Sequence, residues 1–281
     1  MSLQKLRKTL SSILFEKRSS RAGVVIIVAF VLFVMVGPLV VPSPVHNLSN
    51  EYALPSLAHP LGTDQLGADI FAELIWGAAP SMIVGVFGAL GAVLIGLVVG
   101  VFAGYFARWE GALTGMTDIV MIFPAIPLMV LLGTIRPASD IDLIVILSVV
   151  LWPPIARSIR SQVLSLREMP FIEVAKMSGM GDWEIIGKSI MRSVAGIAFA
   201  YFVLTVGASI IVVTGLEYLG VVNPDIVSWG SMIYWGQQFG FYSGAWPWVI
   251  APGAAISLLT IGFAMIGFSF EEVLNPRLRI T

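Results

Sequence analysis

Six long apolar stretches constrain this 281-residue chain more than any other feature of its sequence. A helix needs about 20 mostly apolar residues to cross the hydrocarbon core of a bilayer. Spanning segments must also satisfy their backbone hydrogen bonds internally. We therefore expect an all-α membrane protein with six transmembrane helices. The stretches are 22–41, 81–106, 113–135, 141–155, 194–215 and 247–268.

The first stretch is predicted to remain in the protein as an anchor. It is too long for a typical signal-peptide core, and no A-x-A-like cleavage site follows it. A core domain is expected over 81–281, in which the fourth span is the shortest. The remaining segments are predicted to be a basic N-terminal segment (1–21), two outer loops (42–80 and 216–246), a large inner loop (156–193) and a tail (269–281).

The composition also indicates a membrane protein. Hydrophobic residues make up 57% of the chain and charged residues 12%, against roughly 25% charged in an average soluble domain. There is no cysteine, and the two histidines, His46 and His59, lie in one polar stretch. We expect no metal site, no redox site and no nucleic-acid partner, and the sequence offers no recognisable set of catalytic groups.

The basic residues predict how the chain is oriented. Cytoplasmic segments of membrane proteins are enriched in Lys and Arg. If the N-terminus is cytoplasmic, 15 of the 16 basic residues lie in cytoplasmic segments, and only Arg136 lies outside. We therefore expect both termini in the cytoplasm and the two long acidic loops on the other side.

Several residues inside the predicted spans stand out. Asp118 is an acid well within the third span, where ionisable groups usually face a cavity or a partner; it has either a pathway role or a structural role near the cytoplasmic interface. Pro124 and Pro127 in the same span are each expected to remove a helix hydrogen bond and to kink or unwind the helix. Small residues at a spacing of four favour close helix packing, and the second span has such a series: Gly96, Gly100 and Gly104.

The outer loop 216–246 is dense in aromatic residues, among them Trp229, Tyr234 and Trp235. These side chains could form an interfacial aromatic belt, or a re-entrant surface on which a partner protein docks. The two interpretations are compatible. The three residues are our candidates for such docking.

The inner loop contains Gly187-Lys188-Ser189, which looks like the end of a phosphate-binding loop. Such a loop needs glycine five positions before its last glycine, and that position holds Asp182. Nucleotide binding by this segment is therefore not expected. Pro170 suits the first turn of a helix, Gly179 and Gly181 interrupt the chain, and Asp182 can cap a second helix. The loop is predicted to be a helix–turn–helix, although a solvated connector that fixes topology is an alternative.

The spacing Glu173-x-Ala175-x3-Gly179 resembles the EAA motif of permease subunits of ABC importers. Further blocks are similar to peptide-family permeases of the DppC/OppC type, and together they cover nearly everything from residue 22 onward. These blocks are HPLGTDQLGADIF (59–71), MTDIVMIFPAIPLMVL (116–131), GLEYLGVVNPDIVSWGSMI (215–233), PWVIAPGAAI (247–256) and NPRLR (275–279).

The resemblance implies a type I ABC importer permease in the plasma membrane of a prokaryote. It implies a second homologous permease subunit, two ATP-binding cassette subunits that hold ATP and Mg²⁺, and an extracytoplasmic substrate-binding protein. Relatives import di- and oligopeptides, nickel chelates or oligosaccharides. The first helix of the inner loop would be a coupling helix that docks on an ATPase. The residues that the resemblance and the local pattern assign to this loop are Pro170, Glu173, Ala175, Lys176, Gly179, Gly181 and Asp182.

An ion-coupled secondary transporter is the alternative function. Such proteins normally show ionisable relays inside the membrane and internally repeated halves. Here Asp118 stands almost alone among the predicted spans, and no internal repeat is recognisable.

Overall fold

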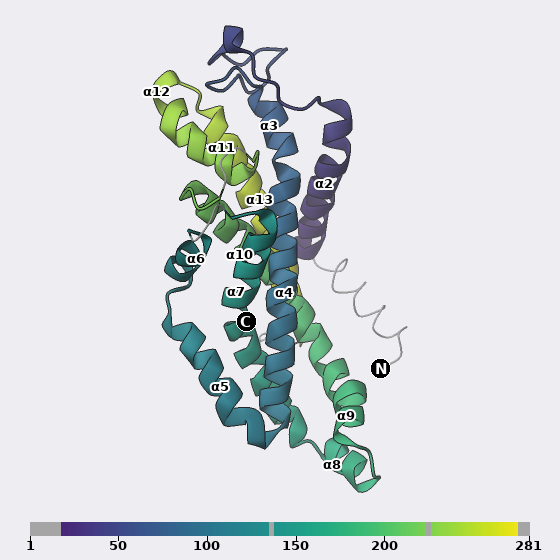
Figure 1. Ribbon diagram of the computed structural model, residues 1–281. Helices are drawn as coiled ribbons and strands as arrows, with labels where there is room; N and C mark the ends of the chain where they lie inside the picture. The colour runs from purple at the N-terminus through teal and green to yellow at the C-terminus, as the bar shows by residue number, and fades with distance from the viewer. Residues whose placement is uncertain (1–17, 135–137, 223–225, 275–281) are drawn as a thin grey trace.

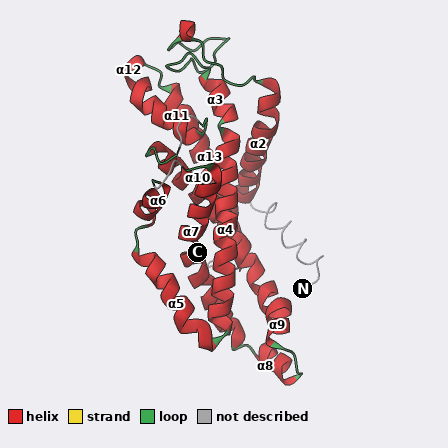
Figure 2. Cartoon of the chain, in the orientation of Figure 1, coloured by secondary structure: helices red, strands yellow, loops and turns green. Residues whose placement is uncertain are grey.

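The computed structural model describes residues 18–134, 138–222 and 226–274, and Arg136 therefore lies outside the described residues. The described part is helical, with loops between the helices and no β-strand (Figures 1 and 2). The helices are α2 (Arg18–Val40), α3 (Ile70–Trp76), α4 (Ala78–Tyr105), α5 (Ala107–Ile122), α6 (Ala125–Gly133), α7 (Asp140–Arg167), α8 (Pro170–Met177), α9 (Asp182–Ile185), α10 (Met191–Tyr218), α11 (Trp229–Trp235), α12 (Phe241–Ser243) and α13 (Pro247–Leu274).

The described helices supply five segments long and apolar enough to cross a membrane, and α5 with α6 makes a sixth if the bent pair is one span. The expected all-α architecture is confirmed, and the number of spans reaches the expected six when α5 and α6 count as one span. The short elements lie at the two ends of the bundle: α3, α11 and α12 at one end, and α8 and α9 at the other (Figure 1). Two π-helical segments, η2 (Ile186–Ile190) and η3 (Gly236–Gly240), continue α9 and α11.

The fourth span is much longer than the sequence suggested. We expected it to end at residue 155, but α7 continues to Arg167 with Pro153 and Pro154 inside it. Proline is tolerated in membrane helices because neighbouring groups satisfy the freed backbone carbonyls. The helix begins with a capping box, in which Ser139 and Asp142 exchange backbone and side-chain hydrogen bonds. Much of the expected inner loop is therefore helix.

The predicted break in the third span is confirmed. Helices α5 and α6 meet at an angle of 81°. Pro124 lies at the break, as the N-cap of α6. The expectation for Pro127 is wrong, because it lies in the first turn of α6, where backbone N–H groups have no acceptor within the helix.

The small-residue series on α4 packs against α7 of the same chain. A Cβ atom placed on any of these glycines would come within 3.0 Å of α7 atoms. At Gly100 it would lie 2.7 Å from the Ala156 carbonyl oxygen. The contacts pair Gly96 with Ile155, Gly100 with Ile159, and Gly104 with Val163. The sequence predicted close packing but did not identify the neighbour.

Helix α10 lies between α4 and α13, and α2 packs on α13. The contact between α2 and α13 is again made at glycines, because a Cβ on Gly23 would lie 2.6 Å from the Gly262 carbonyl oxygen. At the end of the bundle that holds α3, α11 and α12, the large side chains of Trp229 and Trp248 are buried within the same apolar cluster. This cluster joins α11 to the spanning helices.

We predict that Gly100→Ala destabilises the protein by about 1–3 kcal/mol, because the new methyl group meets backbone that cannot move aside. The measurement is the thermal unfolding of purified protein in detergent. Gly253→Ala in α13 is the matched control: nothing lies within 4 Å of its Cβ position, and alanine favours the helix. Equal melting temperatures for the two variants would contradict the assigned α4–α7 contact.

Candidate functional site

Helix α8, the turn at residues 178–181 and α9 form a helix–turn–helix at one end of the bundle, called the elbow below (Figure 1). Pro170 occupies the first turn of α8, as the sequence predicts. Gly179 has a φ of +81°. The Met180 N–H donates to the Ala175 carbonyl oxygen at 3.1 Å, and the Gly179 N–H donates to that of Lys176 at 3.0 Å. These two bonds form a Schellman motif, which requires a left-handed residue that glycine adopts without strain.

One side of the elbow packs onto the ends of the spanning helices. Ile172 of α8 and Ile185 of α9 are fully buried. They belong to an apolar cluster with Ile159 and Val163 of α7 and with Ile190. Ala175 is half-buried and packs on the same cluster. The small side chain of Ala175 therefore has a packing role within the chain, apart from any contact with another protein.

The other side of the elbow presents apolar side chains to the surroundings. Phe171, Val174 and Met177 recur every three residues along α8, and their exposed fractions are 48%, 61% and 82%. Trp183 of α9 is 69% exposed. Glu173 lies on α8 and is also exposed, and it forms no ion pair within the described residues. An exposed apolar surface beside charged groups is typical of a protein contact site.

The C-terminal end of α4 anchors the elbow. The Tyr105 hydroxyl donates a hydrogen bond of 2.8 Å to Asp182 Oδ1. The Lys176 ammonium lies 5.6 Å from the centre of the Tyr105 ring, within range for a cation–π contact. Trp183 packs edge-on against Phe102, with ring centres 5.7 Å apart. A movement of the elbow therefore acts directly on α4.

The predicted helix cap at Asp182 is wrong. The N-cap of α9 is Gly181, which has extended backbone, and no side chain caps this helix end. Asp182 is the first helical residue, and its carboxylate accepts the hydrogen bond from Tyr105 instead. The sequence contains no signal for this bond, because Tyr105 is 77 residues away.

The segment that resembles a phosphate-binding loop is helical. Gly187, Lys188 and Ser189 lie in η2, and the residues just before them lie in α9. The backbone N–H groups there are used within the helix, so they cannot wrap a phosphate. Lys188 forms an ion pair with Glu184 one turn away.

Asp118 has a partner within the chain. Its Oδ1 accepts a hydrogen bond of 2.7 Å from Arg157 on α7, and both side chains are about half exposed. A second ion pair, Glu110 with Arg160 at 2.5 Å, also joins α5 to α7. Exposed pairs of this kind contribute about 0–1 kcal/mol each. A pathway role for Asp118 stays a prediction.

At the opposite end of the bundle, Trp229 is fully buried and cannot belong to an exposed docking surface. Its backbone N–H donates to Ser81 Oγ at 3.0 Å, and its indole N–H donates to the Leu74 carbonyl oxygen at 3.0 Å. These bonds hold α11 onto α3 and α4. Tyr234 and Trp235 are half-buried and pack edge to face, with ring centres 5.0 Å apart.

Sequence reasoning missed Glu217. We placed it in the outer loop, but α10 continues to Tyr218 and buries it. Its Oε2 accepts a hydrogen bond of 3.1 Å from the Gly230 N–H in the first turn of α11. Glu217 therefore positions α11 relative to α10. A carboxylate that follows an apolar run gives no indication that it is buried.

The sequence of the chain matches known proteins. Residues 92–280 match the family described as the binding-protein-dependent transport system inner membrane component. The chain is similar to the dipeptide transport system permease protein DppC of Alkalihalophilus pseudofirmus, at 34% identity over 92% of this chain and 85% of the relative. It is also similar to DppC of Bacillus subtilis, at 30% identity over 94% and 83%. The glutathione transport system permease protein GsiD of Pectobacterium atrosepticum is 30% identical over 80% and 75%.

We predict that Tyr105→Phe loosens the elbow, because it removes the hydrogen bond to Asp182, which contributes about 0.5–1.5 kcal/mol. Amide hydrogen exchange of residues 170–186 should become faster. The matched control is Tyr201→Phe, which removes a 2.7 Å bond to Ser158 between α10 and α7. Unchanged exchange in the elbow of Tyr105→Phe, or the same acceleration there in the control, would contradict the proposed anchor.

Proposed function

The chain belongs to the family of inner-membrane components of binding-protein-dependent transport systems, and from this premise we propose that it is one permease subunit of an ABC importer for peptides. It forms half of the translocation pathway, and a second, homologous permease subunit forms the other half. Two ATP-binding cassette subunits bind ATP and Mg²⁺, and an extracytoplasmic binding protein delivers the solute. The assembly lies in the plasma membrane of a prokaryote.

The observation that carries the proposal is the elbow. Helix α8 projects from the bundle with Phe171, Val174 and Met177 exposed, and it docks in a groove of an ATPase subunit. Glu173 offers its charge to basic groups of that subunit, and Gly179 allows the sharp turn. The whole set assigned to this contact is Pro170, Glu173, Ala175, Lys176, Gly179, Gly181 and Asp182.

The anchor explains how nucleotide-driven movement reaches the membrane. When the ATPase subunits close, α8 moves with them as a rigid body. Tyr105 and Trp183 join the elbow to α4, and the buried isoleucines join it to α7 and α10. The spanning helices therefore tilt together. The ATPase contact at the elbow and the solute pathway between the spanning helices are thus two distant sites. They are coupled because each of them biases the same two-state tilting of the helices.

The substrate class rests on the relatives. The similar proteins are permeases of dipeptide and glutathione transport systems, and these solutes are short peptides. We therefore assign this chain to peptide import. The half-buried Tyr234 and Trp235 at the outer end supply part of the surface on which the binding protein docks.

Orientation can be tested with single cysteines, because the chain has none. We predict that Ala58→Cys and Ser243→Cys react with an impermeant maleimide in intact cells, whereas Ser178→Cys reacts only after the membrane is opened. All three positions are exposed in the structure. Labelling of Ser178→Cys from outside would overturn the proposed cytoplasmic elbow.

The ATPase contact can be tested on the outward face of α8. We predict that Val174→Arg leaves membrane insertion intact, because the side chain is exposed, but places a long charged group in the proposed groove. Peptide uptake in cells and co-purification of the ATPase subunits should fall roughly tenfold or more.

Lys188→Ala is the matched control, because it changes an exposed residue just beyond the elbow, in η2, whose ion pair is with Glu184 one turn away. It should transport at nearly the wild-type rate. Wild-type uptake by Val174→Arg would contradict docking through this face. Uptake that persists without the ATPase subunits and collapses with a proton or sodium ionophore would favour ion-coupled transport.

A further inference from the structure

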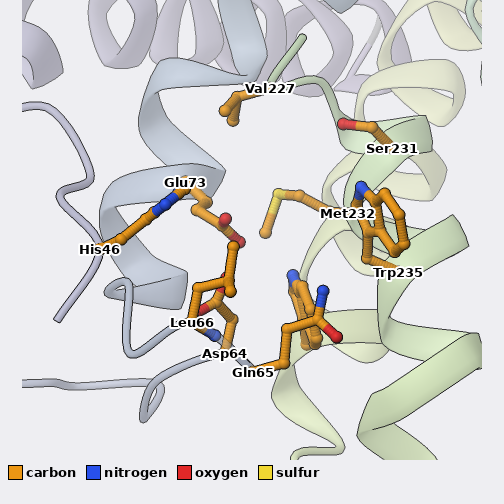
Figure 3. Close-up of a pocket in the computed structure, with 10 residues that line it drawn as sticks. His46, Asp64, Gln65, Leu66, Glu73, Val227, Ser231, Met232 and Trp235 are labelled. Carbon is orange, nitrogen blue, oxygen red and sulfur yellow. Dashed lines mark hydrogen bonds between the residues drawn. The ribbon is translucent and has the colours of Figure 1, made fainter. Parts of the chain in front are cut away.

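A cavity of about 450 Å³ opens at the outer end of the protein, far from the elbow. Its walls come from the loop that follows α2, from α3, from α11 with the residues just before it, and from the start of α13. Figure 3 shows the carboxyl group of Glu73 pointing between Asp64 and Met232 toward the middle of this group of side chains. The volume is in the range of pockets that hold small organic ligands.

Two buried polar groups in the wall lack hydrogen-bond partners. Glu73 is 8% exposed and Trp248 is 2% exposed. The Trp248 indole interacts with the Glu73 carboxyl group, but neither Glu73 Oε2 nor Trp248 Nε1 has a hydrogen bond of standard geometry within the described residues. Native proteins rarely leave such groups unsatisfied. A polar ligand or water in the cavity can complete their hydrogen bonding.

The cavity is acidic: its lining includes the carboxyl groups of Asp64 and Glu73, no Lys or Arg, and one histidine, His46. Asp64 and Asp69 both add negative charge near Glu73. Burial raises the pKa of the Asp64 carboxyl, although backbone N–H groups of Ala68 and Leu66 donate to it and favour the charged form. The segments that line the cavity lie in two parts of the chain, 22–107 and 193–276, that contain no Lys or Arg.

A buried carboxylate is costly to ionise, so a cation that enters the cavity beside Glu73 gains a favourable electrostatic interaction with it. A bound metal ion is not indicated, because the described residues contain no group of three or more His, Cys, Asp or Glu side chains placed to hold one. The space is also much larger than an ion. The indole rings of Trp235 and Trp248 in the wall can stabilise an organic cation through cation–π contact.

We propose that this cavity binds the ammonium group of a small organic amine, in particular the free amino terminus of a short peptide, with Glu73 as its counter-ion. The apolar side chains of Leu66 and Met232 contact the body of the ligand. The identification of the amine as a peptide rests on the proposed importer function. On this basis the cavity is a receiving site at the outer end, beside the aromatic surface assigned to the binding protein.

The test uses the purified full-length chain in lipid nanodiscs and isothermal titration with L-alanyl-L-alanine up to about 10 mM, a range that detects weak binding. We expect saturable binding. The N-acetylated dipeptide, which has no ammonium group, should bind about tenfold more weakly or worse. Equal binding of the two peptides, or no binding by the wild-type chain, would overturn the proposal.

A pair of variants identifies the counter-ion. Glu73→Gln keeps the shape of the side chain and removes its charge, and it should weaken dipeptide binding about tenfold or more. The matched control is Glu51→Gln, which removes the same charge from an exposed position in the loop between α2 and α3 and should bind as wild type. Wild-type affinity in a folded Glu73→Gln would reject Glu73 as the partner.

Binding in this assay needs no ATPase, binding protein or second permease. A failure of the importer proposal would therefore appear as absent ATPase-dependent uptake, with dipeptide binding retained. A failure of the cavity proposal would appear as absent or acetylation-insensitive binding, with uptake retained. If Glu73→Gln does not fold, the comparison of free and acetylated dipeptide on the wild-type chain still decides the question.

Discussion

The glycine series on α4 lets the backbone of this helix lie directly against α7, and both ends of the protein depend on that contact. In a bilayer the lipid tails are as apolar as the side chains, so helices associate through close packing and hydrogen bonds and gain little from burial of apolar surface. Glycine removes the side chain that would keep the two backbones apart. At Gly100 the neighbouring carbonyl oxygen leaves no room even for a methyl group.

Because α4 is held in this way, it can connect two sites at opposite ends of the molecule. Its C-terminal end carries Tyr105, which holds the elbow through Asp182. Its N-terminal end follows α3, which carries Glu73. Trp229 reaches both helices with its hydrogen bonds to Ser81 and Leu74. Under the proposed function, this rigid central helix passes a movement from one side of the membrane to the other.

Helices α5 and α6 are attached quite differently. Thr117 is the one described residue of α5 that is buried, and the two ion pairs to α7 are partly or half exposed. Because the chain bends by 81° at Pro124, α6 runs in a different direction from α5. The weak attachment is consistent with the proposal that a second permease subunit completes this side of the pathway.

Helix α8 also exposes apolar side chains that are not packed within the chain. Poorly packed surfaces of this kind are expected at functional sites.

The sequence by itself determined the features that depend on neighbouring residues or on composition. Apolar runs required membrane helices, Pro124 broke a helix because it has no N–H, and Gly179 ended α8 because glycine adopts a positive φ. Only the tertiary structure decided which groups are buried or paired across the chain. The partner of Asp182, the burial of Trp229 and the contact of Glu217 with Gly230 all depend on how separate helices meet. A local pattern cannot specify such contacts, because they arise from the packing of whole helices and from the need to satisfy buried polar groups wherever that packing places them.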